Sequence, residues 1–246
     1  MEFNKQLLQY LKGEKFSNSL IINLGREKHE DRTRENAIID LIKDLNVLHI
    51  GCSDHIPVIR EKLAVNKWLH KLLTDNSKVC LGIDIDKESI DFVKQELNFK
   101  NVIYGDIISG DINEIIKAQW DFVVFGEIIE HLDNPVYFLQ RFKERYSKCV
   151  KKFIITVPNI YCKNSFKNML KYNETINSDH RFWFTPYTIS KILIMADLTP
   201  EKIIYSNLIN IGNTGFLLRR IKRFLKIPVK YPFYFFKTII ITGNIN

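Results

Sequence analysis

Residues 79–106, VCLGIDIDKESIDFVKQELNFKNVIYGD, contain an apolar run, an amphipathic pattern and a second apolar run in direct succession. VCLGID (79–84) and NVIYGD (101–106) have the length and composition of buried strands. Between them, Asp86 is a suitable N-cap for a helix. The apolar face of this helix is made by Ile90, Val93 and Leu97. A strand, a helix and a strand in this order predict two parallel strands joined by a crossover helix.

The same alternation extends to both sides of this unit. Further strands are predicted at 47–51, 120–127 and 153–158, and two late strands at 201–209 and 235–243. Apolar strands that alternate with helices are typical of a parallel sheet covered on both faces. We therefore predict an α/β fold, a doubly wound, mostly parallel, seven-stranded Rossmann-like sheet with an antiparallel C-terminal strand.

Helices are predicted between these strands. An apolar stripe indicates one helix around 38–45, and a longer helical stretch is expected over about 56–74. Two more helices begin at 134–135 (Asn-Pro) and 185–186 (Thr-Pro), because a capping side chain followed by proline is the usual start of a helix.

We interpret residues 1–246 as a single domain with three additions to the alternating pattern. Residues 1–35 form an entrance segment that is dense in charge at 26–34, and 159–184 form a predicted substrate loop. Residues 216–234 form a basic amphipathic insertion. This insertion is either a lid helix with a solvated basic face or a surface for peripheral contact with anionic membrane.

Composition excludes several classes of protein. Hydrophobic residues make up 46% of the 246 residues, which is enough for a sizeable core and excludes bulk disorder. The net charge of +8 permits anionic partners without requiring them. No apolar run reaches the roughly 18 residues of a membrane span, and the N-terminus lacks a signal-peptide core. The four cysteines form no CxxC pair, so we expect free thiols and a cytoplasmic protein.

Polar residues and one glycine stand at successive strand ends. Gly51 follows the first strand, and Asp84, Asp106 and Glu127 follow or end the next three. Ligands of open parallel sheets bind beyond these ends. Asp84 is placed to accept both hydroxyls of a ribose, and Asp106 to accept from an adenine amine. For any single acid, a helix cap is the alternative interpretation.

The loop after the first strand indicates which adenosine cofactor is bound. Residues 51–55, Gly-Cys-Ser-Asp-His, contain one glycine, whereas a dinucleotide loop uses three to embrace a pyrophosphate. A pyrophosphate would also meet Asp54. S-adenosylmethionine (SAM) has no phosphate and carries a cationic sulfonium, so it suits a loop with carboxylates better.

The strings VLHIGCSD, LGIDID, YGDI, FGEIIEHLDNP, ITVPN and DHRFWFTPYTISKIL resemble, as an ordered set, the class I SAM-dependent methyltransferases. The resemblance runs from about 26 to 200 and is nearest to the subgroup found in bacterial surface-polysaccharide and small-molecule pathways. The cofactor-binding residues that it implies are His49, Gly51, Cys52, Ser53, Asp84, Ile85, Asp106, Ile107, Gly126 and Glu127. His49 replaces the usual acid and Ser53 the usual second glycine, so the loop departs from the family pattern at two positions.

Methyl transfer to a hydroxyl needs a group that removes a proton. His131, after the fourth strand, and His180, before a helix start, are the candidates, with Glu130 beside the first of them. A capping or scaffold role is the alternative for each. We predict O-methylation of a sugar or small-molecule hydroxyl, with no nucleic-acid partner.

Two other functions remain open. Glu127, Glu130 and His131 fall at i, i+3 and i+4, and with His180 they are residue types that hold a divalent cation. This pattern resembles the metal-dependent ribose 2′-O-methyltransferases of small RNA, although our prediction includes no metal. The departures at His49 and Ser53 favour a third possibility, a non-catalytic cofactor-binding module.

Overall fold

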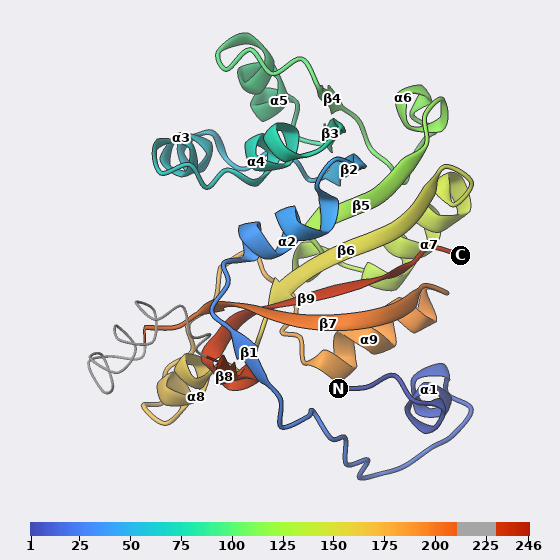
Figure 1. Ribbon diagram of the computed structural model, residues 1–246, viewed down its shortest axis with the longest axis vertical. Helices are drawn as coiled ribbons and strands as arrows, with labels where there is room; N and C mark the ends of the chain where they lie inside the picture. The colour runs from blue at the N-terminus through green and yellow to red at the C-terminus, as the bar shows by residue number, and fades with distance from the viewer. Residues whose placement is uncertain (211–229) are drawn as a thin grey trace.

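The computed structural model describes residues 1–210 and 230–246 (Figure 1). Most of the predicted basic insertion, 216–234, therefore lies outside the described residues. The described chain forms a seven-stranded sheet with helices on both faces, and a separate two-stranded sheet near the N-terminal segment.

The main sheet has the strand order β4-β3-β2-β5-β6-β9-β7. The five strands from β4 to β6 are mutually parallel, and β9 inserts antiparallel between β6 and β7. The bounds are β2 (Asn46–Ile50), β3 (Val79–Asp84), β4 (Val102–Tyr104), β5 (Trp120–Gly126), β6 (Val150–Pro158), β7 (Thr199–Leu208) and β9 (Phe236–Asn244). This arrangement confirms the predicted fold class.

The helices follow the predicted alternation with one correction. Their bounds are α1 (Lys5–Lys12), α2 (Arg34–Ile42), α3 (Ile56–Ala64), α4 (Leu69–Asn76), α5 (Lys87–Gln95), α6 (Asn113–Ile116), α7 (Pro135–Tyr146), α8 (Lys163–Met169) and α9 (Pro186–Met195), with 3₁₀ turns η1 (Ile129–His131) and η2 (Phe233–Phe235). The single helix expected over 56–74 is wrong, because α3 and α4 are separate. The helical conformation is interrupted between them at Asn66, whose φ of 52° lies in the left-handed region.

Apolar side chains of the helices cover both faces of the sheet. On one face, α7 and α9 contribute Leu139, Phe142, Ile189 and Leu193 to the largest core cluster. On the other, α2 and α4 contribute Ile38, Ile42 and Leu73. The sheet is therefore buried on both sides, as its continuous apolar strands require.

Side-chain caps fix where three helices begin. The Asn134 side chain accepts a hydrogen bond from the Tyr137 amide (3.0 Å), and Thr185 forms a capping box with Thr188. The Asp86 carboxylate accepts from the amide of Glu88 at 3.1 Å. All three caps confirm the predicted helix starts.

The N-terminal segment runs along the sheet before α2. Within it, β1 (Lys28–Glu30) pairs antiparallel with β8 (Lys230–Pro232). Asn207 on β7 then anchors the start of α2, because its side-chain oxygen accepts from the Arg34 amide at 3.0 Å. This contact places Arg34 beside the sheet, next to β7.

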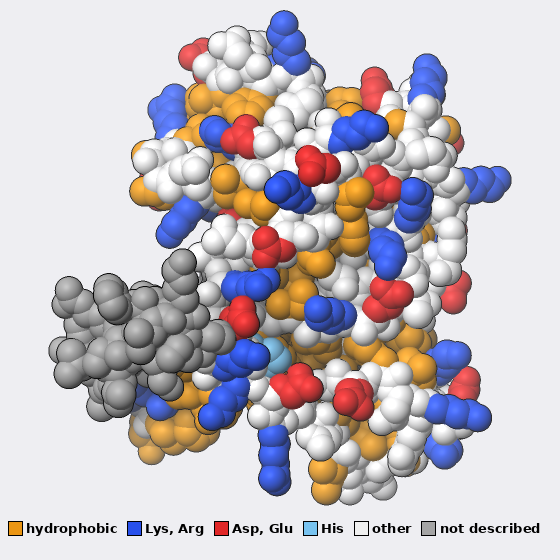
Figure 2. All heavy atoms as spheres, in the orientation of Figure 1, with side chains coloured by type: hydrophobic (Ala, Val, Ile, Leu, Met, Phe, Trp, Pro, Cys, Tyr) orange, Lys and Arg blue, Asp and Glu red, His pale blue; other side chains and the backbone are white. Residues whose placement is uncertain are grey.

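Surface and burial add three observations. Among the described residues, no helix has both the length and the apolarity needed to cross a membrane. On the face in Figure 2, Lys and Arg side chains are spread among Asp and Glu rather than gathered in one patch. All four cysteines are free and buried, as expected.

Candidate functional site

A cleft of about 470 Å³ opens at the C-terminal ends of β2, β3 and β5. The strand order reverses between β2 and β5, which is where open α/β sheets bind ligands. The residues that line the cleft are Arg34, His49, Gly51, Cys52, Ser53, Asp54, His55, Val58, Lys62, Trp68, Leu69, Asp84, Asp86, Gly126, Glu127, Ile128, His131, Asn177, Asp179 and His180. Its volume is in the range of small-molecule sites.

Gly51 is required by the backbone at this point. Its φ is 66°, and a Cβ atom there would lie 2.4 Å from Cδ1 of Ile128. Its amide donates to the carbonyl of Ile83 at 2.8 Å, so the loop remains close to β3. The glycine therefore opens the cleft floor between the first strand end and η1.

Asp84 connects the loop to the second strand end. One carboxylate oxygen accepts from the Ser53 amide and the other from the Asp86 amide, both at 3.0 Å. The carboxylate is thereby held in one orientation, and its oxygens keep lone pairs for further donors. This geometry suits a pair of vicinal ribose hydroxyls.

Three predicted adenine contacts lie outside the cleft lining. Ile85 is 70% exposed, and Ile107 is buried in the core. Asp106 accepts from the Ile108 amide at 3.0 Å and from the hydroxyl of Ser109. These contacts lower the pKa of Asp106 against the opposing effect of burial. Contact of these residues with adenine stays a prediction.

His49 forms a buried pair with a residue that the sequence analysis did not single out. Its Nδ1 lies 3.3 Å from Nδ1 of His70, with the rings nearly parallel. Burial lowers the pKa of His49 well below its usual range and that of His70 to about 4. Both rings are therefore neutral at neutral pH, so His49 adds no charge to the cleft.

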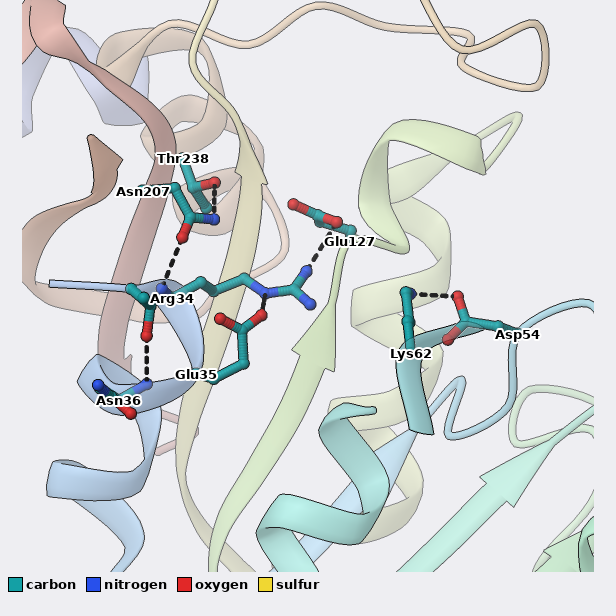
Figure 3. A network of polar contacts seen from close by, with 9 residues as sticks. Arg34, Glu35, Asn36, Asp54, Lys62, Glu127, Asn207 and Thr238 are labelled. Carbon is teal, nitrogen blue, oxygen red and sulfur yellow. Dashed lines mark hydrogen bonds and ion pairs between the residues drawn. The ribbon is translucent and has the colours of Figure 1, made fainter. Parts of the chain in front are cut away.

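Arg34 is the main residue that sequence reasoning missed. Its Nη1 pairs with Glu127 at 2.7 Å and its Nε with Glu35 at 3.2 Å (Figure 3). Burial opposes the charge, but the two carboxylates outweigh it and raise the pKa of Arg34. The only available signal was the dense charge at 26–34, which does not indicate which side chain turns inward.

The two candidate histidines meet at the mouth of the cleft. The rings of His131 and His180 are in edge-to-face contact, with centroids 4.6 Å apart. The Arg181 amide donates to the Glu130 carbonyl at 2.8 Å, which holds the segment 159–184 against η1. Burial, and then His131, lower the pKa of His180. The lowered pKa favours the neutral form of the His180 ring at neutral pH.

Glu130 lies behind this pair. It is fully buried, and neither carboxylate oxygen has a hydrogen-bond partner among the described residues. Burial raises the pKa of its carboxyl group to about 8. Ligand atoms of Glu130, His131 and His180 all lie within 4.8 Å of one another, whereas Glu127 is not part of this group. The structure thus brings together three of the four residues proposed for a cation.

The charges of the cleft indicate whether a dinucleotide with its pyrophosphate or SAM with its sulfonium is the better ligand. Its lining includes five carboxylates, on Asp54, Asp84, Asp86, Glu127 and Asp179, against two permanent cations, on Arg34 and Lys62. Lys62 is itself paired with Asp54 at 2.6 Å (Figure 3). A surplus of negative charge disfavours a pyrophosphate and suits a sulfonium cation. The residues present therefore fit SAM.

Comparisons with known proteins agree with the fold described above. A family model described as a methyltransferase domain matches residues 65–146, one third of the chain. A SAM-dependent methyltransferase from Archaeoglobus fulgidus is 21% identical, with a TM-score of 0.52, over 86% of this chain and 91% of its own. A SAM-dependent methyltransferase from Thermotoga maritima is 11% identical, with a TM-score of 0.55, over 86% and 87%.

A third structure, of the small RNA methyltransferase HEN1, is 15% identical with a TM-score of 0.52. The match covers 86% of this chain but 24% of that protein. No curated protein matches the chain. The chain therefore has the fold of solved SAM-dependent methyltransferases, and residues 65–146 match a methyltransferase domain.

Proposed function

We propose that this methyltransferase transfers the methyl group of SAM to a hydroxyl group of a sugar or another small molecule. The observation that carries the proposal is the contact of His131 and His180, centroids 4.6 Å apart, where both rings line the cofactor cleft. An alcohol needs a proton acceptor as it attacks, and a neutral histidine at the cleft mouth supplies one.

Different residues of the chain bind the parts of the cofactor and accept the proton of the acceptor. The cofactor supplies a methyl group already activated by its sulfonium. Asp84 holds the ribose, and His49 and residues 51–53 lie along the methionine portion. Asp106, Ile85 and Ile107, which lie outside the cleft lining, are assigned to the adenine end. One histidine accepts the hydroxyl proton at a ring nitrogen. The bound cofactor would then give up its methyl group to the acceptor oxygen, with its methyl–sulfur bond broken, and leave as S-adenosylhomocysteine (SAH). Gly126 and Glu127 complete the floor.

A separate segment of the chain is proposed to bind the acceptor. We assign residues 159–184 as the acceptor loop of a single domain, because the loop is closed at its base by the bridge between Asn159 and Phe184 and carries His180. The buried free cysteines support a reducing, cytoplasmic setting.

The experiment is a methyl-transfer assay with labelled SAM against a panel of free sugars, nucleotide sugars and RNA oligonucleotides. We expect transfer to a sugar, and we expect His131→Asn or His180→Asn to lower kcat by roughly 10²–10⁴-fold with unchanged SAM binding. His29→Asn, in β1 and outside the lining of the cleft, serves as the matched control. Transfer to RNA alone, or cofactor binding without turnover on any acceptor, would contradict the proposal.

A cation-assisted version of the reaction is the second candidate. The cluster of Glu130, His131 and His180 favours it, because the buried Glu130 carboxylate has no partner among the described residues. A divalent cation there would polarise two neighbouring hydroxyls, as a sugar or a ribose offers. Elemental analysis of purified protein, with activity measured before and after chelation, shows whether the reaction needs a divalent cation. Full activity in a metal-free, chelator-treated preparation removes this candidate.

A further inference from the structure

A second cavity, of about 760 Å³, is formed by the segment 159–184 together with η2. Its walls are made mainly by apolar and aromatic side chains, among them Ile160, Tyr161, Phe166, Met169, Trp183 and Tyr234. We call this cavity the aromatic pocket. Among the described residues, none lines both the aromatic pocket and the cofactor cleft. Its volume is in the range of small-molecule sites.

The aromatic pocket and the cofactor cleft share one stretch of chain. Residues 173–175 and Trp183 line the pocket. Between them in sequence, the lining of the cleft includes Asn177, Asp179 and His180. The Trp183 ring is in edge-to-face contact with the His180 ring, with centroids 6.2 Å apart. A ligand in the pocket therefore lies next to the histidine that we propose as a proton acceptor.

The apolar walls of the pocket are open to solvent. Figure 1 shows α8 at the periphery of the fold, and no residue of this helix is buried. Phe166 and Met169 on α8 are 56% and 58% exposed, and Tyr161 and Tyr234 are 46% and 41% exposed. Exposed apolar side chains that gather around one cavity mark a binding site, because covering them removes apolar surface from water.

One positive charge of the pocket has no carboxylate partner. Lys163 Nζ lies over the ring of Phe235, 5.1 Å from its centroid, and among the described residues it forms no ion pair. The carboxylate of Glu174 accepts from the indole nitrogen of Trp183 at 2.8 Å. Residues 211–229 contain no Asp or Glu. The pocket thus combines apolar walls with a cation that can bind an anionic group.

We propose that the aromatic pocket binds the apolar portion of the methyl acceptor and that Lys163 binds an anionic group of the same molecule. This inference rests on the proposed function and narrows its substrate class. The acceptor is an amphiphile, a hydroxyl compound that carries a hydrocarbon or aromatic portion and a phosphate, sulfate or carboxylate. Its hydroxyl lies towards His180, because Trp183 connects the pocket to that ring. A sugar without an apolar substituent leaves the pocket unfilled and binds more weakly.

Calorimetry with three small probes tests the pocket without any methyl transfer. 2-Naphthyl phosphate has an aromatic body and an anionic group, 2-naphthol has only the aromatic body, and inorganic phosphate has only the anionic group. All titrations contain excess SAH, so that the cofactor cleft is occupied. We expect 2-naphthyl phosphate to bind about three- to tenfold more tightly than 2-naphthol, and inorganic phosphate alone not to bind.

Three variants of α8 locate the bound probe. Phe166→Ala should weaken both naphthyl probes about five- to tenfold, because an aromatic contact is lost. Lys163→Gln should weaken 2-naphthyl phosphate about three- to tenfold and change 2-naphthol binding by less than about twofold. The matched control is Lys167→Gln, one turn later on the same helix, which is exposed and outside the lining of the pocket. It should alter neither affinity.

The binding results separate the pocket from other surfaces. The proposal is overturned if neither naphthyl probe binds, or if Phe166→Ala binds both as tightly as the unaltered protein does. Equal effects of Lys163→Gln and Lys167→Gln overturn the anionic part of the proposal. Co-sedimentation with phosphatidylglycerol vesicles, without binding of the soluble probes, would show that this face contacts a membrane instead, which also overturns it.

Kinetics connect the pocket to methyl transfer. The acceptor panel is extended by 2-naphthyl glycosides and their phosphates. With the acceptor so found, Phe166→Ala should raise the KM for that acceptor about five- to tenfold and leave the KM for SAM unchanged. An unchanged KM for the acceptor overturns the proposal. No turnover on any acceptor, with the naphthyl probes still bound, would instead refute the proposed function and leave the pocket as a binding site.

Discussion

Replacing Glu130 by glutamine should change how the stability of the protein depends on pH. The carboxyl group is fully buried with no partner among the described residues, and burial raises its pKa from 4.5 to about 8. Between these two values the folded protein holds a proton that the unfolded chain has released. The free energy of unfolding therefore falls as the pH rises through this window.

The size of the effect follows from the shift in pKa. At about 1.4 kcal/mol per pKa unit, the change from 4.5 to about 8 corresponds to a loss of about 5 kcal/mol across the window. Glutamine has nearly the same shape and cannot ionise, so Glu130→Gln removes this dependence. The variant should gain about 3–5 kcal/mol relative to the unaltered protein between pH 5 and pH 9.

Urea unfolding followed by circular dichroism at pH 5, 6, 7, 8 and 9 measures this difference, with a chelator present to exclude divalent cations. Glu144→Gln is the matched control, because that carboxylate is 59% exposed on α7 and pairs with Arg141. For Glu144→Gln, the free energy of unfolding plotted against pH should run parallel to that of the unaltered protein. Parallel curves for Glu130→Gln as well would refute the burial argument.

Two further predictions concern the cofactor and the sheet. Asp84→Ala should weaken SAH binding by roughly hundred-fold in calorimetry, since two hydrogen bonds to a charged acceptor are lost; equal affinity would remove the ribose assignment. Gly243→Ala should lower stability by about 2–4 kcal/mol, because its Cβ would lie 2.1 Å from the Thr199 carbonyl oxygen. Gly110→Ala, with no atom within 4 Å of the added Cβ, is the control, and equal melting temperatures for the two variants would contradict the packing argument.

The sequence by itself determined the fold class and the place of the site. Strand and helix patterns are local, because periodicity and caps such as Asp86 and Thr185 depend on neighbouring residues alone. Parallel strands must also present their C-terminal ends at one edge, so Gly51, Asp84 and Glu127 could be assigned to a common cleft before any coordinates. Local patterns failed at Asn66, where a single left-handed residue divides one expected helix into two.

Only the tertiary structure decided which charges meet inside the cleft. Arg34 pairs with Glu127 across 93 positions of sequence, and His49 with His70 across 21. Such contacts are set by how α2 and α4 pack on the sheet, which no spacing rule encodes. Burial likewise gave Glu130 and His180 their altered pKa values, because desolvation depends on the surrounding atoms and not on the residue's neighbours in sequence.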